Sequence, residues 1–214
     1  MKNKLYKCQN NETDVVLEYF GTDFKGTVLE IGANDGITLS NSYDLIKMGW
    51  DAELLEPGKT YKELLKLYEG QYGIGVRNFG IGICANGGAK LKFHESGAHV
   101  KGGNDSGLVS SSIHGEIEKW KSKGVQFTDS EIQIYNFKEF CDIAQRYKFD
   151  YISIDVEGME PEVLSQIDLN EVGCKVLCIE WNSRNALDSM FTDYCNSFGM
   201  NETHRNAENL IFAK

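Results

Sequence analysis

The stretch VLEIGANDG, residues 28–36, decides the fold. Its apolar first half indicates a buried strand, and Gly32 and Gly36 allow the backbone to turn sharply after that strand. We expect a helix over residues 37–48, whose free N–H groups would favour a carboxylate or a phosphate above the turn. A strand, a glycine turn and a helix in this order are typical of a nucleotide site in an α/β protein.

The spacing of the glycines separates the possible nucleotide ligands. A dinucleotide fingerprint has glycine at three positions, which are occupied here by Gly32, Asn34 and Ile37. Two side chains therefore block the close approach of a pyrophosphate, and a nicotinamide-dependent oxidoreductase is disfavoured. A P-loop is also disfavoured, because no Gly-Lys-Ser/Thr sequence follows the turn.

The composition indicates a single globular domain. No Pro-, Ser- or Gln-rich linker divides the 214 residues, so we predict one domain over residues 1–214. The 22 Lys and Arg residues against 32 Asp and Glu leave no basic stripe, which disfavours nucleic acid and anionic membranes as partners. The sequence shows neither a membrane-spanning apolar run nor the apolar core of a secretion signal, so a cytoplasmic location is expected.

Six cysteines are scattered along the chain without a C-x-x-C motif, and most fall inside apolar runs. We therefore expect reduced thiols in the core. Cys174 and Cys178 have a spacing that would suit a zinc site completed by a histidine, but both fall in a predicted strand and its lead-in. A zinc site is accordingly disfavoured.

The first half of the chain alternates between strands and helices. Residues 1–26 are predicted to form a helical brace, with Thr13 as the cap of its helix. Residues 52–56 indicate a second buried strand, and Thr60 and Glu63 predict a capping box for the next helix. This alternation indicates a parallel sheet with right-handed crossovers.

The middle of the chain breaks this alternation. Two strands are expected over residues 75–84 and 89–94, joined as a hairpin by a turn at 86–88. The region 95–124 is polar and rich in glycine, so we predict a substrate loop or lid with a short helix over 113–123.

Regular elements return in the last third of the chain. Asn136 predicts the start of one helix, Pro161 the first turn of another, and a third is expected from Arg184. The expected strands lie at 132–135, 149–155 and 174–181, followed by two short strands in the tail.

Acidic residues stand at the ends of four predicted strands: Glu30, Glu56, Asp155 and Glu180. Ligands of open α/β sheets bind at these carboxyl ends, where the strand order reverses. Glu56 lies about 20 residues after Gly36, the spacing at which an acid on the second strand accepts hydrogen bonds from a ribose diol. We favour ribose binding over the alternative, a solvated acid at a strand end.

From Val28 to Lys214 the chain resembles the FkbM family of S-adenosylmethionine-dependent methyltransferases. The residues that carry the resemblance are Glu30, Gly32, Ala33, Asn34 and Gly36 in the turn, Glu56 with Pro57, and IDVEGME at 154–160. The resemblance implies a Rossmann-like class I fold, with a mostly parallel seven-stranded sheet, a reversed C-terminal hairpin and helices on both faces. It also implies O-methylation of a sugar or of a small glycosylated molecule.

The cofactor that the resemblance implies is S-adenosylmethionine, and each of its parts has candidate partners in the chain. Glu30 and the turn 32–36, with Asn34 and Asp35, would hold the amino-acid end, and Glu56 the ribose. Adenine is expected near Ile83, and Asp155 completes the cofactor site.

Two catalytic routes are open, and both use the acids of the last strands. In the first, Asp155 or Glu157 is a general base for the acceptor hydroxyl, with a pKa raised by neighbouring acids. In the second, Asp155 and Glu180, with Asn182, bind Mg²⁺ and lower the pKa of that hydroxyl.

Other polar and aromatic residues have a structural interpretation beside the functional one. Ser111 and Ser112 would bind acceptor hydroxyls or form a solvated turn, and Trp181 would stack on a sugar or cap the core. The histidines at 94, 99 and 114 are expected in exposed loops. As an alternative for the whole chain, a non-catalytic scaffold would keep the cofactor fold without turnover.

Overall fold

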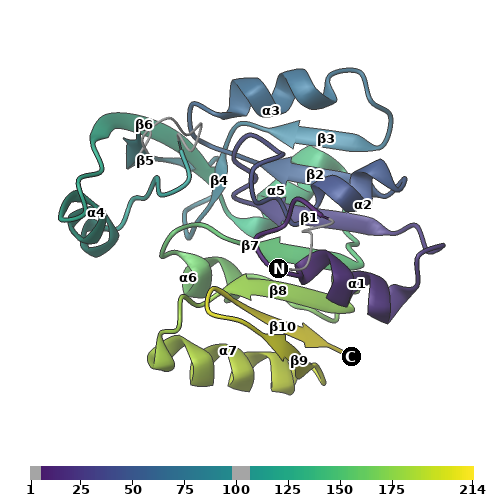
Figure 1. Cartoon of the computed structure of the whole chain (residues 1–214). Helices are drawn as coiled ribbons and strands as arrows, with labels where there is room; N and C mark the ends of the chain where they lie inside the picture. Colours follow the sequence, from purple (N-terminus) through teal and green to yellow (C-terminus); the bar gives the residue numbers. More distant parts are fainter. Residues whose placement is uncertain (1–5, 98–106) are drawn as a thin grey trace.

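The computed structural model of the protein describes residues 6–97 and 107–214 (Figure 1). Its main sheet contains β1 (Thr27–Ile31), β2 (Asp51–Leu55), β3 (Ile74–Arg77), β7 (Tyr151–Ile154), β8 (Val176–Glu180), β9 (Asn201–Arg205) and β10 (Asn209–Ala213). The strand order is β3-β2-β1-β7-β8-β10-β9, and β10 runs antiparallel to both of its neighbours. The predicted seven-stranded, mostly parallel sheet with a reversed final hairpin is confirmed.

Helices cover both faces of this sheet. The described helices are α1 (Glu12–Phe20), α2 (Tyr43–Lys47), α3 (Tyr61–Tyr68), α4 (His114–Lys121), α5 (Phe137–Ala144), α6 (Glu160–Leu164) and α7 (Asn185–Ser197). Apolar residues of α1, α2 and α3 pack in one core cluster, and those of α5, α6 and α7 pack in another. Successive strand residues such as Val28 and Leu29 enter opposite clusters, as the alternation of a strand requires. None of the described helices has the length and hydrophobicity needed to cross a membrane.

The connection between β1 and α2 differs from the prediction. We expected a helix from residue 37, but α2 begins at Tyr43. The Asp35 carboxylate accepts hydrogen bonds from the backbone N–H of Ile37, at 2.9 Å, and of Thr38, at 2.7 Å. Such local bonds compete with helix formation. The helix start therefore does not lie at the glycine turn, and residues 37–42 form a loop instead.

The middle of the chain forms a second, smaller sheet instead of the predicted hairpin. It has the order β4-β6-β5, with β4 (Gly80–Ile81), β6 (Phe127–Tyr135) and β5 (Ala89–Ser96). β5 pairs with β6 in antiparallel register, and no pairing joins β5 to β4. The pairing with β6 is favoured because it brings together Phe93, Ile132 and Ile134, the apolar cluster of this sheet.

The helix caps test the local predictions. Asn136 caps α5 as predicted, because its side-chain oxygen accepts from Glu139 N at 3.0 Å. The predicted capping box of α3 is wrong, since Thr60 makes no side-chain cap bond and has helical backbone angles. The prediction for α1 is also wrong, since Asn11 is the N-cap and Thr13 lies inside the helix.

All six cysteines are unpaired, as expected. Cys174 and Cys178 are completely buried in β8 and its lead-in among apolar residues. Burial raises the pKa of both thiols, which keeps them protonated. Neither belongs to the group of described residues that is close enough to hold a metal ion.

Candidate active site

A cavity of about 340 Å³ opens at the carboxyl ends of β1, β2, β7 and β8. The strand order reverses between β1 and β7, and ligands of α/β sheets bind at this switch point. The small sheet forms the opposite wall, where Phe93, Ile132 and Ile134 line the cavity. The site thus has one wall of polar strand ends and one of apolar side chains.

The structure brings most of the predicted site residues into this cavity. Those that line it are Glu30, Gly32, Asn34, Glu56, Ser112, Asp155, Glu157, Glu180 and Asn182. Those that do not are Asp35, Gly36, Ile83, Ser111 and Trp181. In the second group, the side chains of Asp35, Ser111 and Trp181 form hydrogen bonds within the protein instead.

Glu56 lies directly after β2 and is nearly completely buried. Its two carboxylate oxygens each accept one backbone hydrogen bond, from Asn34 N at 2.9 Å and from Gly58 N at 2.6 Å. Burial raises the pKa of Glu56 to about 7, and these hydrogen bonds oppose the rise. Each carboxylate oxygen retains lone pairs that can accept a further hydrogen bond from a ligand.

Glu30 occupies the corresponding place on β1, but a loop covers it. Its carboxylate accepts hydrogen bonds from the hydroxyls of Ser40 and Ser42 and from Asn41 N. Burial raises the pKa of this carboxyl, and the three donors lower it. Glu30 therefore holds the loop 40–42 against the sheet. It also forms part of the cavity wall.

The two glycines of the turn are required by packing within the protein. Gly32 has a φ of +92°, and a Cβ atom there would lie 1.7 Å from the carbonyl oxygen of Asp155. A Cβ atom at Gly36 would lie 2.5 Å from Leu64 of α3. Asn34 adopts a left-handed conformation between them, with a φ of 47°, and this directs its N–H to Glu56. The turn thus joins β1, β7 and α3 and presents Glu56 to the cavity.

The predicted adenine contact at Ile83 is corrected by the structure. Ile83 is 68% exposed and lies outside the cavity, while Ile81 of β4 lines it. The backbone N–H of Ile83 donates to Glu162 at 2.7 Å, so Glu162 anchors this segment as well as lying in the first turn of α6. Asp35 is likewise occupied by the turn that it closes.

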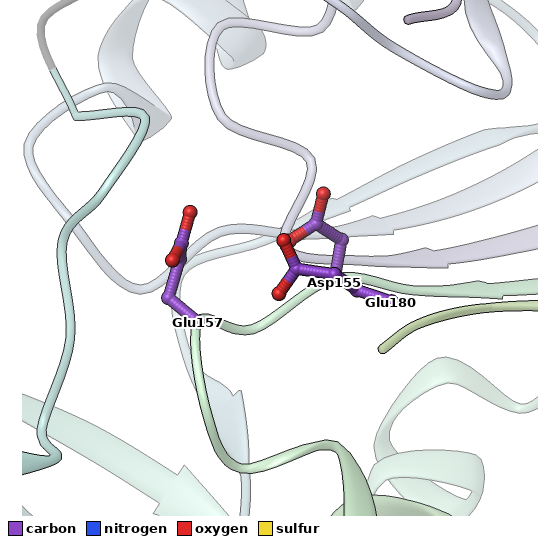
Figure 2. A group of neighbouring side chains, drawn as sticks. All are labelled: Asp155, Glu157 and Glu180. Carbon is purple, nitrogen blue, oxygen red and sulfur yellow. The ribbon is translucent and has the colours of Figure 1, made fainter. Parts of the chain in front are cut away.

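Asp155, Glu157 and Glu180 form a cluster at the ends of β7 and β8, and Figure 2 shows their carboxylates gathered together. One oxygen of each lies within 4.8 Å of the others, close enough to share a metal ion. Burial, with the charges of Glu160 and Glu30, raises the pKa of Asp155 to about 7. Burial and neighbouring acids also raise the pKa of Glu157 and of Glu180 well above the usual range.

The backbone around this cluster is held in an unusual conformation. Glu157 has a φ of 53°, which is uncommon for a residue other than glycine. The Ser111 hydroxyl donates to the Glu157 carbonyl at 2.7 Å, and the Glu160 carboxylate accepts from Val156 N and Gly158 N, each at 3.0 Å. Strained conformations of this kind persist where the surroundings fix them, often at functional sites. Ser111 and Glu160 therefore support the position of Glu157.

The remaining predicted substrate residues are engaged within the protein. Trp181 is 7% exposed, and its indole N–H donates to the Asn206 carbonyl at 3.0 Å. It belongs to the core, so its structural interpretation fits the contacts. Ser112 lines the cavity, but its hydroxyl lies 2.9 Å from the sulfur of Met159.

The histidines that the structure describes do not line the cavity. Nδ1 of His94 lies 2.7 Å from the Asp129 carboxylate on the small sheet, and His114 is the first residue of α4. His99 lies outside the described residues.

Several lining residues were missed by sequence reasoning. The apolar wall is formed by Leu91, Phe93, Ile132, Ile134 and Trp120, and the opposite rim includes Gln9 and Glu208. The alternation of Leu91 with Phe93 and of Ile132 with Ile134 is a strand signal that indicates one shared face. No local signal indicates that Gln9 and Glu208, from opposite ends of the chain, both line this cavity.

The charge of the cavity is one-sided. Six of its lining residues are acids, namely Glu30, Glu56, Asp155, Glu157, Glu180 and Glu208. Within the ranges 6–97 and 107–214, no Lys, Arg or His lines it. This arrangement favours a ligand that carries positive charge.

The sheet order, the reversed hairpin and the cavity at the switch point define a Rossmann-like methyltransferase fold. Residues 30–201 match the FkbM methyltransferase domain. Because this match covers most of the sequence, the chain belongs to the FkbM methyltransferase family. No curated protein matches the chain.

Solved structures show the same fold at low sequence identity. The FkbM methyltransferase from Methylobacillus flagellatus KT aligns with a TM-score of 0.55 and 14% identity, over 89% of this chain and 44% of that one. This chain thus spans less than half the length of that relative. A protein from Pyrococcus horikoshii, described provisionally as an RNA methyltransferase, aligns with a TM-score of 0.51 and 13% identity. That alignment covers 95% of this chain and 80% of the other.

Proposed function

We propose that this chain transfers the methyl group of S-adenosylmethionine to a hydroxyl of a sugar or of a small glycosylated molecule. The observation that carries the proposal is the meeting of Glu56 and the cluster of Asp155, Glu157 and Glu180 in one cavity at the switch point. Glu56, which would accept hydrogen bonds from the ribose hydroxyls, and the candidate bases therefore line the same cavity.

The residues of the cavity fit the parts of this cofactor. When bound, S-adenosylmethionine supplies an electrophilic methyl group on a positively charged sulfur. Glu56 has free lone pairs for the ribose diol, and its position is fixed by two backbone N–H groups. The excess of lining acids favours the cationic sulfur and ammonium groups electrostatically.

A place for adenine is available between the two sheets. A Cβ atom at Gly80 would lie 3.5 Å from Ile134, 3.8 Å from Pro57 and 3.9 Å from Ile132. These are ordinary van der Waals distances, so the four residues form one continuous apolar stretch of the cavity wall. A flat heterocycle packs on such a surface better than a charged group, because no ionised partner is needed. This apolar stretch replaces Ile83 as our assignment.

Asp155 is the best placed general base. The structure shows no hydrogen bond to its carboxylate from the residues that it describes, so the oxygens are free to accept the proton of an acceptor hydroxyl. A pKa of about 7 balances the fraction that is ionised at neutral pH against the strength of the base. Burial and the charges of Glu160 and Glu30 keep this pKa high.

A second route uses the same carboxylates to hold Mg²⁺. The three acids present oxygen ligands of the kind that Mg²⁺ prefers, and Asn182 lines the same part of the cavity. A bound cation would lower the pKa of a hydroxyl on the acceptor. Activity that EDTA removes and Mg²⁺ restores would favour this route over a metal-free base.

The apolar wall of the cavity indicates which kind of methyl acceptor would fit. Phe93, Trp120 and Met159 line the cavity together with the acids, so one side of a ligand would meet apolar surface and the other would meet carboxylates. Sugars combine apolar ring faces with hydroxyl edges, and they suit such a pair of walls. This chemistry supports a carbohydrate or glycosylated acceptor.

Isothermal titration calorimetry with S-adenosylmethionine and S-adenosylhomocysteine is the first test, with the Glu56→Ala variant as the control for site-specific binding. We expect both compounds to bind the wild type and to bind the variant more weakly. Formation of S-adenosylhomocysteine is then followed over a panel of neutral, amino and phosphorylated sugars. Failure of both cofactor forms to bind would refute the proposal, and binding without transfer would favour a non-catalytic scaffold.

A further inference from the structure

The carboxylate of Glu12, the first residue of α1, is buried outside the cavity lining, and its charge contributes to the raised pKa of Asp155. Its side chain has no exposed surface, and its oxygens accept from Asn10 N at 2.8 Å and from the side-chain amides of Asn206 and Asn209, each at 2.9 Å. Burial raises the pKa of Glu12, but these bonds reverse the effect and lower it below the usual value. A buried carboxylate is thus held by amide groups from opposite ends of the chain.

The two asparagines bracket the turn between β9 and β10. The side-chain oxygen of Asn206 accepts from Glu208 N at 3.0 Å and from Asn209 N at 2.7 Å. Asn206 N in turn donates to the Asn209 carbonyl at 3.0 Å. Glu12 therefore binds a turn that is closed by its own hydrogen bonds, and a displacement of one asparagine would disturb the whole turn.

This turn holds the chain that follows β8. The Glu208 carbonyl accepts from Trp181 N at 2.8 Å and from Asn182 N at 3.1 Å. The Ser183 hydroxyl donates to the Ala207 carbonyl at 2.8 Å. Asn182 and Ser183 both have positive φ, 48° and 53°, a conformation that persists only where the surroundings fix it. The turn supplies that constraint.

The segment so fixed directly follows Glu180 and forms part of the cavity. Glu180, Asn182, Glu208 and Gln9 all line it, and Asn209 stands opposite Glu180 in the β8–β10 register. The Asn10 side chain also donates to the Glu208 carboxylate at 3.0 Å. Glu12, Asn206 and Asn209 lie outside the cavity lining and outside residues 30–201 that match the family.

We propose that Glu12 is a positioning residue for the reaction, because its carboxylate fixes the 206–209 turn and, through this turn, the Glu180 and Asn182 side of the cavity. The inference rests on the proposed methyl transfer for its catalytic consequence, while its structural part stands without it. It assigns to the N-terminal segment a role in shaping the acidic wall, in addition to packing on the sheet.

The Glu12→Gln variant tests this coupling with little change in volume. Oε1 accepts from both asparagines and Oε2 accepts from Asn10 N, so an NH₂ group at either position removes the acceptor of one of these donor sets. Glu53→Gln is the matched control, because Glu53 is 3% exposed, pairs with Arg77 at 3.0 Å and does not line the cavity. Both variants lose a buried carboxylate, but only Glu12 is hydrogen-bonded to the turn.

Hydrogen exchange without cofactor is the first measurement. We expect the amides of Trp181 and Asn182 to exchange about tenfold faster in Glu12→Gln, and to be unchanged in Glu53→Gln. The double variant Glu12→Gln with Asn209→Asp restores a donor–acceptor pair and should recover slow exchange. If Glu12→Gln folds poorly, Glu12→Asp keeps the charge and should show a smaller increase at the same amides. Unchanged exchange at these amides in a destabilised variant would overturn the proposal and leave Glu12 as an anchor of α1 only.

The second measurement separates positioning from binding. With the best acceptor of the sugar panel, we expect kcat of Glu12→Gln to fall about tenfold, because small displacements of reacting groups are costly. The dissociation constant of S-adenosylmethionine should stay near that of the wild type, since Glu56 is not touched. Faster exchange with unchanged kcat would refute the role in the reaction. Failure of the wild type to bind the cofactor would refute the proposed function, while the exchange result would still test the coupling.

Discussion

The carboxylates in the two halves of the cavity differ in the hydrogen bonds that they accept. In the bonded half, on β1 and β2, Glu30 and Glu56 accept hydrogen bonds from backbone and hydroxyl donors. In the open half, on β7 and β8, the described residues provide no such bond to Asp155 or Glu157, and Glu180 receives one from Asn182. Glu30, Glu56 and Glu180 are buried while Asp155 and Glu157 are half-buried, so the halves differ in exposure as well as in the donors that surround them.

This contrast indicates different tasks for the two halves. A carboxylate whose position is fixed by hydrogen bonds binds a ligand without reorganisation, which suits the ribose of a cofactor. A crowded carboxylate without donors has a raised pKa and can take a proton, which suits a base. Under the proposed function, the bonded half would bind the cofactor and the open half would supply the base.

The largest effect is expected in the open half. Asp155→Asn removes the proposed base and should lower turnover about a thousandfold, within the range of general-base catalysis. Binding of S-adenosylmethionine should remain measurable, because Glu56 keeps its donors. The measurement combines S-adenosylhomocysteine release with calorimetry. If Asp155→Asn turned over as fast as the wild type, both the general-base route and the metal route would be misassigned.

The Glu56→Gln variant tests the ribose-binding role proposed for the bonded half. The amide would lose one of its backbone donors and the charge that binds the ribose, so the cofactor should bind about thirtyfold more weakly. Calorimetry measures this change, and Glu53→Gln, on the strand that precedes Glu56, is the control for stability. Equal affinities in the wild type and Glu56→Gln would remove the ribose assignment.

The two halves share a prediction for stability. Burial raises the pKa of Glu56 from 4.5 and of Asp155 from 3.8, both to about 7. Between the ordinary and the raised pKa values the folded protein binds more protons than the unfolded chain, so the free energy of unfolding falls as pH rises. Thermal unfolding should therefore occur at a lower temperature at about pH 8 than at about pH 6.

The control for this pH dependence is Glu56→Gln, whose side chain is neutral throughout. Its melting temperature should change less with pH than that of the wild type. A wild-type melting temperature that rises across this window would contradict the raised pKa values.

The smallest effect concerns the support of the open half. Ser111→Ala removes the hydroxyl that donates to the Glu157 carbonyl and accepts from Ile113 N, and kcat should fall about threefold, as expected for the loss of hydrogen bonds that support Glu157 from outside the cavity. Ser165→Ala is a matched control, because the Ser165 hydroxyl also donates to a carbonyl, at 2.8 Å, but on the exposed side of α6. Equal kcat values in the two variants would show that Ser111 does not support Glu157.

Local patterns were sufficient for the main sheet and much of the bonded half. The apolar run before Gly32 and the acid Glu56 after the second strand are read within a few residues, and the structure places both at the cavity. The cap at Asn136 is equally local, and it forms as predicted. The capping box at Thr60 does not form, because the backbone there is already helical.

The small sheet shows where prediction from local sequence patterns was wrong. The glycine turn at 86–88 predicts a hairpin, but β5 pairs with β6, more than thirty residues further along the chain. Which of two possible partners a strand takes depends on side chains such as Phe93 and Ile132 that meet only in the folded protein. The same limit applies to Ile83. We expected it near the cofactor, but its side chain is exposed to solvent.

By itself the sequence determined the α/β class, the family resemblance and the acids at the strand ends, because strand periodicity, glycine turns and strand-end residues are local properties of the chain. Only the tertiary structure decided which acids receive donors, which serine supports Glu157, and that Glu12 reaches the Asn206 and Asn209 turn. These contacts join segments far apart in the sequence. Their geometry follows from the packing of the whole chain, and no short stretch contains it.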